Sequence, residues 1–208
     1  MATESTSEEK LKARIAAMGE PLGSLFDALD GQVAWLHVKL RNFRTLYAQS
    51  KDRIGILNKI APSFFHQLQE TIHEAVLLHL CRITDRTQTG GHDNLTIQRF
   101  TGLLMTPERE RQAATLIQDI NSKVEFARRW RHLRLAHLDL NGMIGGPSRP
   151  VPPSSLGSIE DAISGIRTLM NYIHGQFQSG SIGYEHTIEG LGGVESFVSF
   201  LERFVDSD

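Results

Sequence analysis

The sequence of 208 residues has a single cysteine, Cys81, and therefore cannot form an internal disulfide. It also lacks any run of about 18 apolar residues that could span a bilayer, and its polar, acidic first nine residues are unlike a secretion signal. These absences predict a cytoplasmic protein with no membrane segment. Because Cys81 lies in an apolar run, we expect its thiol to be buried and inert.

The chain also lacks an excess of positive charge. It has 22 lysines and arginines against 24 aspartates and glutamates, a formal net charge of −2. A protein that coats nucleic acid without regard to sequence usually needs a broad basic surface, so that class is disfavoured. The basic residues gather instead in one segment, where we expect a phosphate to bind. The members of this cluster are Arg128, Arg129, Arg131, His132, Arg134 and His137.

No segment has a convincing strand pattern, whereas apolar residues repeatedly recur at alternating steps of three and four, the period of an amphipathic helix. The three long helices are expected over residues 22–47, 62–85 and 106–141, the third without a break. A short helix is expected over 95–104, after a loop over 87–94. The sequence therefore predicts an all-α fold, an up-and-down helical bundle with a small C-terminal helical extension.

The length suits one hydrophobic core with irregular ends. We expect residues 1–20 to be a polar segment, partly disordered or helical, and residues 21–140 to form the bundle. Residues 141–208 should contain a loop rich in proline and glycine, followed by two helices that pack on the bundle. The stretch 75–83 is apolar on nearly every side, which predicts that other helices or a partner chain surround it.

Three histidines on the second long helix raise the question of a metal site. His66, His73 and His79 are seven and six residues apart, so they do not supply the pair at i and i+4 that a helical zinc site commonly uses. We therefore expect solvated or capping histidines, and neither a metal nor another cofactor. A metal hydrolase ranks lowest among the functions considered.

The basic cluster contains an arginine and a polar residue, then four residues, then a histidine: Arg131, His132 and His137. Near the end of a long helix, this arrangement resembles the arginine-to-histidine motif of the HEPN superfamily. The surroundings look similar to its abortive-infection branch of the AbiU type. The segments that carry this likeness are residues 36–47, 78–85 and 94–96 and an arginine-rich helix that ends at residues 136–139, so the resemblance covers roughly residues 22–140.

The resemblance implies a dimeric, metal-independent RNA endonuclease of the toxin or antiviral-defence kind, in which the motifs of two subunits meet in one cleft. RNA would be its substrate, a second copy its partner, and an antitoxin or other regulatory protein a possible additional partner. RNA carries its own nucleophile, the 2′-hydroxyl, so a proton acceptor and a cation at the phosphate can suffice. Histidine titrates near neutral pH, and arginine offers a permanently charged planar fork.

Roles follow for individual residues under this resemblance. His137 would transfer the proton and Arg131 would bind the phosphate. The supporting residues would be His132 and Arg134, which position RNA or the site, Asp139, which accepts a hydrogen bond from His137, and Arg82 with Asp85, which brace the catalytic helix. The nucleic-acid-binding residues would be Arg128, Arg129 and Arg134.

Structural explanations compete with these roles. Arg131 could form an ion pair with Asp85 or Glu125, and His137 could be a cation favoured by the helix dipole. The protein would then be a non-catalytic dimeric module that binds a nucleotide, RNA or a partner protein. Trp35 and Trp130 flank apolar stripes, so core or dimer contacts are a better interpretation for them than stacking on bases.

The spacing of the motif has a geometric consequence. Six residues on an unbroken α-helix correspond to about 9 Å of rise and roughly 120° of rotation, so Arg131 and His137 would point to different faces. Since no glycine or proline interrupts residues 131–136, we expect the working arginine and histidine to come from different subunits of an obligate or tight dimer.

Overall fold

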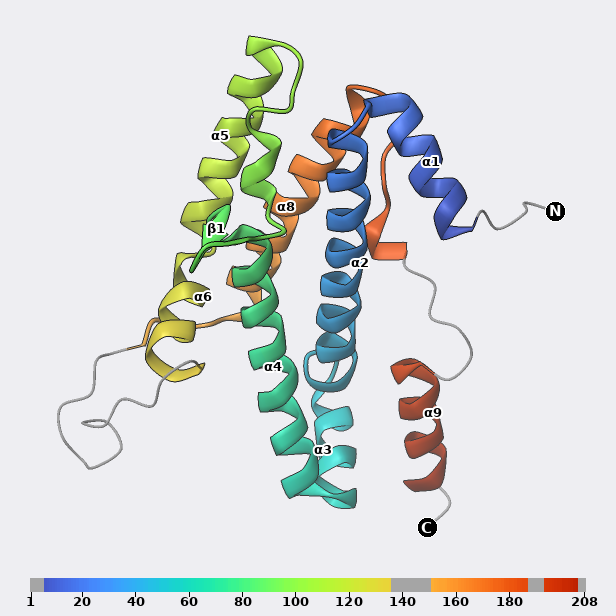
Figure 1. The fold of residues 1–208 in the computed structure, drawn as a ribbon. Helices are drawn as coiled ribbons and strands as arrows, with labels where there is room; N and C mark the ends of the chain where they lie inside the picture. The colour runs from blue at the N-terminus through green and yellow to red at the C-terminus, as the bar shows by residue number, and fades with distance from the viewer. Residues whose placement is uncertain (1–5, 136–150, 187–192, 206–208) are drawn as a thin grey trace.

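The computed structural model describes residues 6–135, 151–186 and 193–205, and the predicted all-α bundle is confirmed (Figure 1). The α-helices are α1 (Ser7–Met18), α2 (Leu22–Tyr47), α3 (Lys51–Ile60), α4 (Pro62–Thr84), α5 (Pro107–Lys123), α6 (Glu125–Trp130), α8 (Leu156–Gly175) and α9 (Val194–Val205). The shorter elements are strands β1 (Gln88–Thr89) and β2 (His92–Asp93), 3-10 helices η1 (Ile97–Phe100) and η3 (Tyr184–His186), and the π-helical turn η2 (Arg131–Leu135). Within the described ranges, no helix has the length and apolar character needed to cross a membrane.

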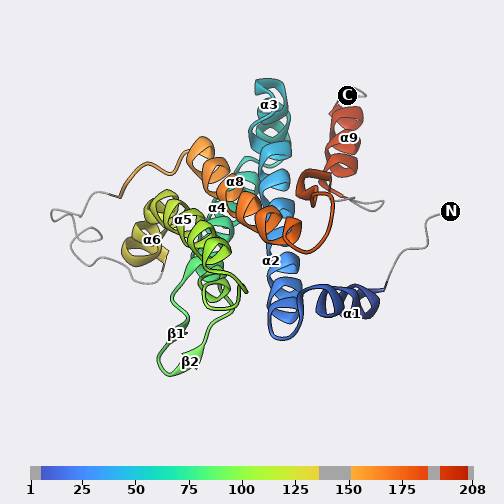
Figure 2. The same cartoon turned by 90° about the horizontal axis from the view of Figure 1, so that it is seen from above.

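Helices α2, α4, α5 and α8 enclose the main core (Figure 2). The spacing that predicted α2 is the spacing of its buried side chains, which include Phe26, Leu29, Val33, Leu36 and Leu40. Helix α8 buries an equally regular stripe against α5, so part of the C-terminal third lies in the same core as the bundle. A smaller cluster joins α9 to α3 and α4 through Val198, Leu201, Leu57 and Phe65.

The apolar stretch of α4 is covered by this same chain. Val76, Leu77, Leu80, Cys81 and Ile83 are all buried in the main core. The expectation of a buried thiol at Cys81 is confirmed, and burial raises the pKa of this thiol to about 11. Because α4 is enclosed without a second chain, its apolar surface is not evidence for a dimer.

The prediction of one unbroken helix over residues 106–141 is wrong. Helix α5 ends at Lys123, α6 begins at Glu125, and residues 131–135 form the π-helical turn η2. Val124 lies between the two α-helices with φ −94° and ψ 0°, and both Val124 and Ala127 are fully buried. Both side chains enter the core at this break, where tertiary packing overrides local helix preference.

The segment between α4 and α5 also differs in detail from the prediction. The expected loop over 87–94 contains the antiparallel pair β1 and β2, in which Thr89 pairs with His92. The expected helix over 95–104 is reduced to the single 3-10 turn η1, whose Ile97 and Phe100 are buried. A buried anchor at each end of this turn holds the segment against the bundle.

Helix α1 crosses α2 at Gly23, the one glycine of this pair where a side chain would collide with backbone. A Cβ at position 23 would lie 2.7 Å from the Cα atom of Ile15. Arg14 on α1 also forms ion pairs with Asp27 and Asp30 on α2, each with an N···O distance of 2.5 Å. The polar N-terminal segment is thus partly helical and tied to the bundle.

Replacing this glycine tests the packing of α1. Gly23→Ala should lower the free energy of unfolding by about 1–3 kcal/mol, because the added methyl group forces the helices apart. Gly31→Ala in the same helix is the control: a Cβ at position 31 would have nothing within 4 Å, so this substitution should raise stability by about 0.5–1 kcal/mol. Equilibrium urea unfolding measures both, and equal effects would contradict the close approach.

Candidate functional site

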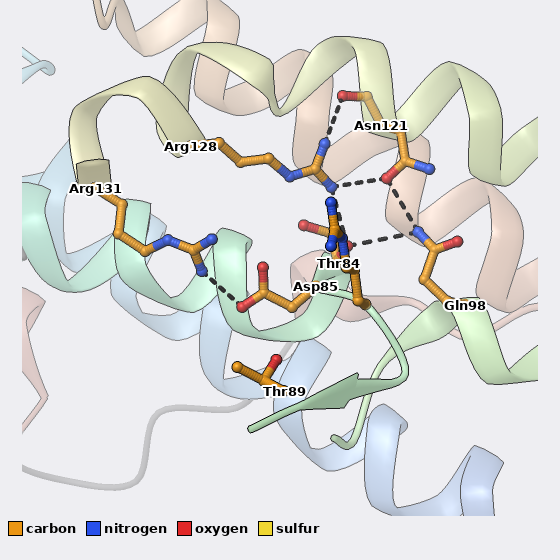
Figure 3. A pocket seen from close by; sticks show the side chains of 8 residues that line it. Thr84, Asp85, Thr89, Gln98, Asn121, Arg128 and Arg131 are labelled. Carbon is orange, nitrogen blue, oxygen red and sulfur yellow. Dashed lines mark hydrogen bonds and ion pairs between the residues drawn. The ribbon is translucent and has the colours of Figure 1, made fainter. Parts of the chain in front are cut away.

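The C-terminal end of α4 borders a cavity of about 630 Å³ (Figure 3). Its walls come from α4, the β1–β2 hairpin, η1, α5, α6 and η2. The lining residues are Thr84, Asp85, Arg86, Thr89, Gln98, Asn121, Arg128 and Arg131. Three of these side chains are arginines and one is a carboxylate, so the cavity is cationic and its volume suits a small ligand or one unit of a polymer.

Arg131 and Asp85 form an ion pair at the edge of this cavity. Nη1 of Arg131 donates to Oδ2 of Asp85 at 2.6 Å, and the two side chains are 33% and 26% exposed. The hydrogen bond to Asp85 raises the pKa of Arg131, so its positive charge is permanent. The structural prediction that Arg131 pairs with Asp85 is confirmed; the other candidate partner, Glu125, lies 3.9 Å from Arg128 instead.

Arg128 joins three elements behind the same wall. Its Nη2 donates to the carbonyl oxygen of Thr84 at 2.9 Å and to Oδ1 of Asn121 at 2.7 Å, and its Nη1 donates to the carbonyl oxygen of Asn121 at 3.1 Å. Nε2 of Gln98 donates to the same Oδ1 of Asn121 at 3.0 Å. Arg128 therefore fixes α6 to the ends of α4 and α5, as Figure 3 shows.

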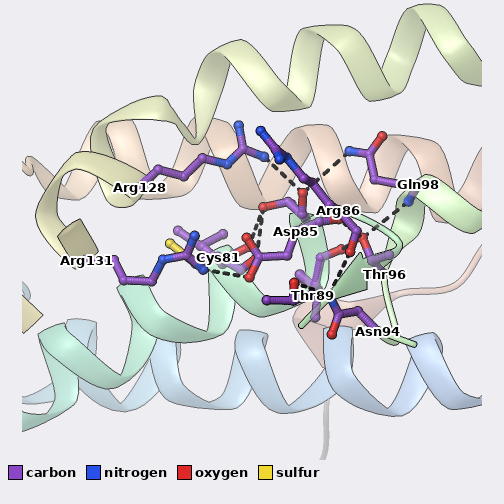
Figure 4. Close-up of polar contacts among 12 residues, drawn as sticks. Cys81, Asp85, Arg86, Thr89, Asn94, Thr96, Gln98, Arg128 and Arg131 are labelled. Atoms are coloured by element: carbon purple, nitrogen blue, oxygen red, sulfur yellow. Dashed lines mark hydrogen bonds and ion pairs between the residues drawn. The ribbon is translucent and has the colours of Figure 1, made fainter. Parts of the chain in front are cut away.

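Side chains near η1 fix the backbone that follows α4 (Figure 4). Oγ1 of the buried Thr96 donates toward the carbonyl oxygens of Ile83 and Asp85, at 3.1 and 2.7 Å. Nδ2 of Asn94 donates to the carbonyl oxygen of Arg86 and to Oγ1 of Thr89, both at 2.8 Å. The short segment 94–96 thus holds Asp85 and Arg86 in place at the mouth of the cavity.

A comparison with known protein families bears directly on this geometry. The family model of HEPN AbiU2 proteins matches residues 19–194. The chain belongs to this family. No curated protein and no solved structure matches it. The match extends beyond residues 22–140, where the sequence resemblance was placed, and includes all of α8, in agreement with the shared core. Membership of the AbiU2 family suggests a role in abortive-infection defence.

Two of the AbiU-like segments, residues 36–47 and 78–85, meet between α2 and α4. Nζ of Lys39 donates to Nδ1 of His79 at 3.2 Å. The expectation that His79 is solvated or caps a helix is wrong: it is buried, and desolvation, with the nearby charges of Lys39 and Arg82, lowers its pKa to about 4. His79 is therefore neutral near pH 7 and holds the lysine ammonium without cancelling its charge.

The other expected site residues are distributed unevenly. His132 and Arg134 lie exposed on η2, and Arg129 and His132 line a separate hollow of about 330 Å³ beside Arg128. Arg82 is exposed on α4, and Asp85 pairs with Arg131 rather than with it. His137 and Asp139 lie outside the described residues, so their roles stay predictions.

Some cavity residues were not singled out from the sequence. Arg86 directly follows Asp85, which was expected to brace the catalytic helix. This position is the one feature of the sequence that could have indicated Arg86 as a site residue. Gln98 and Asn121 have no such signal, because they come from separate elements, η1 and α5, and their direct hydrogen bond forms only in the folded chain. Across the described ranges, no three His, Cys, Asp or Glu side chains lie together as metal ligands would.

Trp130 anchors the far side of η2. Its indole N–H donates to the carbonyl oxygen of Pro152 at 2.8 Å, and its ring meets His73 edge-on. Nε2 of His73 lies 2.9 Å from Oγ of Ser154. These contacts agree with the interpretation of Trp130 as a packing residue, and they hold residues 152–154 against α4 and α6.

The bonds of Arg128 predict a role in stability that its neighbour does not share. Arg128→Ala should lower the free energy of unfolding by about 1.5–3 kcal/mol, because it removes charged hydrogen bonds to carbonyl groups at two helix ends. The exposed Arg129→Ala should change it by less than about 0.5 kcal/mol. Urea unfolding of the two variants measures both changes. Equally small changes in Arg128→Ala and Arg129→Ala would contradict the structural role of the Arg128 hydrogen bonds.

Proposed function

We propose that the protein is a metal-independent RNA endonuclease of the toxin or antiviral-defence kind, with Arg131 at its catalytic site. The observation that carries the proposal is the state of Arg131. Its guanidinium lies in the cationic cavity, one of its nitrogens is held by Asp85, and its Nε and Nη2 have no hydrogen-bond partner among the described residues. An arginine held in this way can still present a donor fork to phosphate oxygens.

The proposed reaction needs no group beyond RNA and protein side chains. The 2′-oxygen loses its proton to His137 and bonds to the adjacent phosphorus. The bond between phosphorus and the 5′-oxygen then breaks, and that oxygen takes up a proton from a protonated histidine or from water. The products are a 2′,3′-cyclic phosphate and a 5′-hydroxyl. Arg131 stabilises the negative charge that develops on the phosphate oxygens.

Other residues support this reaction in different ways. Asp85 holds the Arg131 side chain so that little conformational freedom is lost when the phosphate binds. Arg86 lines the same cavity and offers a second cation. His132, Arg134 and Arg129 lie along or beside η2, where they would contact RNA outside the cavity. Arg128 acts mainly through the three carbonyl and amide oxygens that it binds.

The ion pair also favours a second function. An ion pair between Arg131 and Asp85 can equally well have a structural role, in which it connects η2 to the end of α4. The cavity would then bind a nucleotide or RNA without cleaving it. The two functions differ in one observable property. A binding module retains intact RNA, whereas the proposed nuclease converts it to shorter products in the absence of metal.

Cleavage assays with Arg131 variants test the proposal. With labelled RNA and excess chelator, Arg131→Ala should lower kcat by about 10²-fold or more. Arg131→Lys should also lose most activity, because an ammonium group cannot reproduce the planar fork. The exposed Arg111→Ala, on α5, is the control and should behave as wild type. Full activity in Arg131→Lys, or cleavage that stops in chelator, would contradict the assignment.

We further propose that the active form is a homodimer with the motifs of both subunits in one cleft. The α-helical geometry from which the sequence analysis favoured pairing between subunits does not describe residues 131–135, which form the π-helical turn η2, and His137 lies outside the described residues. The family resemblance supports the dimer, and mixed dimers can test the pairing directly.

The dimer makes two measurable predictions. Sedimentation should show a dimer at tens of micromolar, and a monomer there would contradict the shared cleft. A purified heterodimer of one Arg131→Ala subunit and one His137→Ala subunit keeps one arginine and one histidine on opposite chains. It should cleave RNA faster than either mutant homodimer. If it is as inactive as both, while wild type is active in parallel, pairing across subunits is wrong.

A further inference from the structure

Three side chains outside the cavity form a second surface of unusual composition, on the exposed side of α2 and α4. Trp35 is 62% exposed, the highest value for a tryptophan, tyrosine or phenylalanine among the described residues, so the core contact that the sequence led us to consider for it is wrong. Lys39 follows four residues later, on the same face of α2. Arg82 is exposed on α4 and close enough to lower the pKa of Lys39, after the larger effect of desolvation. We call Trp35, Lys39 and Arg82 the α2–α4 surface.

The direction of the helices connects this surface to the cavity. Figure 1 shows α2 and α4 side by side and antiparallel, and the bond between Lys39 and His79 fixes their register. Arg82 lies about one helical turn beyond His79, toward the C-terminal end of α4, where Asp85 borders the cavity. Because α2 runs the opposite way, Trp35 lies about one turn from Lys39 toward the same end. The surface therefore extends from the cavity over the two helices.

The charges on this surface are unbalanced. Lys39 and Arg82 repel each other, and neither forms an ion pair with any residue in 6–135, 151–186 or 193–205. The carboxylate nearest in sequence to Arg82 is Asp85, which pairs with Arg131. Within the described part of the chain, the one group that binds the Lys39 ammonium is the neutral, buried His79, so the positive charge is held in position but not compensated there. Two adjacent cations destabilise the folded protein slightly unless an anion binds between them.

We infer that the α2–α4 surface is a second contact for single-stranded RNA, in which Lys39 and Arg82 bind one backbone phosphate and Trp35 stacks on a neighbouring base. Aromatic side chains beside a cationic track are the usual means of binding single strands, since every base has a face on which to stack. The inference rests on the proposed function for the identity of the nucleic acid. It adds three binding residues that lie outside the arginine-rich segment of α6 and η2.

A second copy of this chain suits the surface less well. A twofold contact would bring the same two cations of each subunit toward one another, because an isologous interface places one patch against itself. Carboxylates on the surface would be needed to offset that repulsion, and Asp85 is already engaged. A phosphate removes the imbalance directly.

Binding to a non-cleavable strand tests the inference apart from catalysis. The probe is a fluorescein-labelled 2′-O-methyl RNA decamer, and anisotropy gives its Kd over a range of salt concentrations. Lys39→Ala should reduce the steepness of log Kd against log salt by about 0.7, the contribution of one phosphate on a single strand. Lys39→Arg should restore it, and Lys59→Ala on the exposed end of α3 should not alter it. Arg82→Ala should behave as Lys39→Ala, and the double variant should lose no more slope than either, because the one phosphate is bound only when both cations are present.

The tryptophan is tested in the same assay. Trp35→Ala should raise Kd at least about fivefold, the lower end of the effect of one base-aromatic stack, with little change in salt dependence. Met105→Ala removes a side chain that is even more exposed, at 79%, and should leave Kd unchanged. Sedimentation of Trp35→Ala and Lys39→Ala should match wild type.

Each outcome supports or overturns the inference. If wild type cleaves RNA but the variants bind the decamer as tightly as wild type does, the inferred RNA contact on the α2–α4 surface is wrong, whereas the proposed nuclease function stands. If the variants lose binding as expected while wild type cleaves nothing, the surface stands and the nuclease is wrong. If wild type neither binds nor cleaves, both are wrong. If the substitutions dissociate a dimer, the surface is a subunit interface and the inference fails.

Discussion

The ion pair between Asp85 and Arg131 is the contact on which the organisation of the site depends. It joins the first residue after α4 to the first residue of the π-helical turn, two points 46 residues apart in the chain. The neighbouring polar contacts serve the same junction. The carbonyl oxygens of Ile83, Thr84, Asp85 and Arg86 accept hydrogen bonds from Thr96, Arg128 or Asn94. The carbonyls at a helix end lack partners within the helix, and side chains from later elements supply them here.

Under the proposed function, this arrangement gives a protein of negative net charge a local cationic site for RNA. With a formal net charge of −2, the protein attracts RNA poorly as a whole. The bundle compensates by fixing a few cations with defined geometry: Arg131 against a carboxylate, Arg128 against carbonyls, and Lys39 against a neutral histidine. The neutral histidine leaves the charge of Lys39 uncompensated. A rigid frame of this kind lowers the conformational cost of binding phosphate.

The helical periods were sufficient to predict the bundle and the stripe of α2, because burial of one face is a local pattern in the sequence. The Asp85–Arg131 pair could be named as one of two options, since both residues stood in segments with a recognised likeness. The break at Val124 and the π-helical turn could not be predicted. Residues 124–135 contain no glycine or proline, and the change of direction follows from burying Val124 and Ala127 against helices distant in the chain.

The same distinction applies to individual polar residues. Arg128, Arg129, Arg131 and Arg134 are equivalent cations in the sequence, but only the fold shows that Arg128 binds carbonyl groups and Arg131 a carboxylate. His79 looked like one of three similar histidines, and only its contact with Lys39 across two helices shows it to be buried and neutral. Charge and spacing identify a region, whereas tertiary contacts determine the role of each residue within it.

The most direct test of the proposed nuclease is the chemistry of the cut ends. A DNA strand that contains one ribonucleotide should be incubated with the purified protein in excess chelator and the products analysed by mass spectrometry. The proposed reaction predicts cleavage only after the ribonucleotide, with a 2′,3′-cyclic phosphate on one product and a 5′-hydroxyl on the other. Cleavage at deoxynucleotides, or products with 5′-phosphate ends, would show that the 2′-hydroxyl is not the nucleophile and would contradict the central claim.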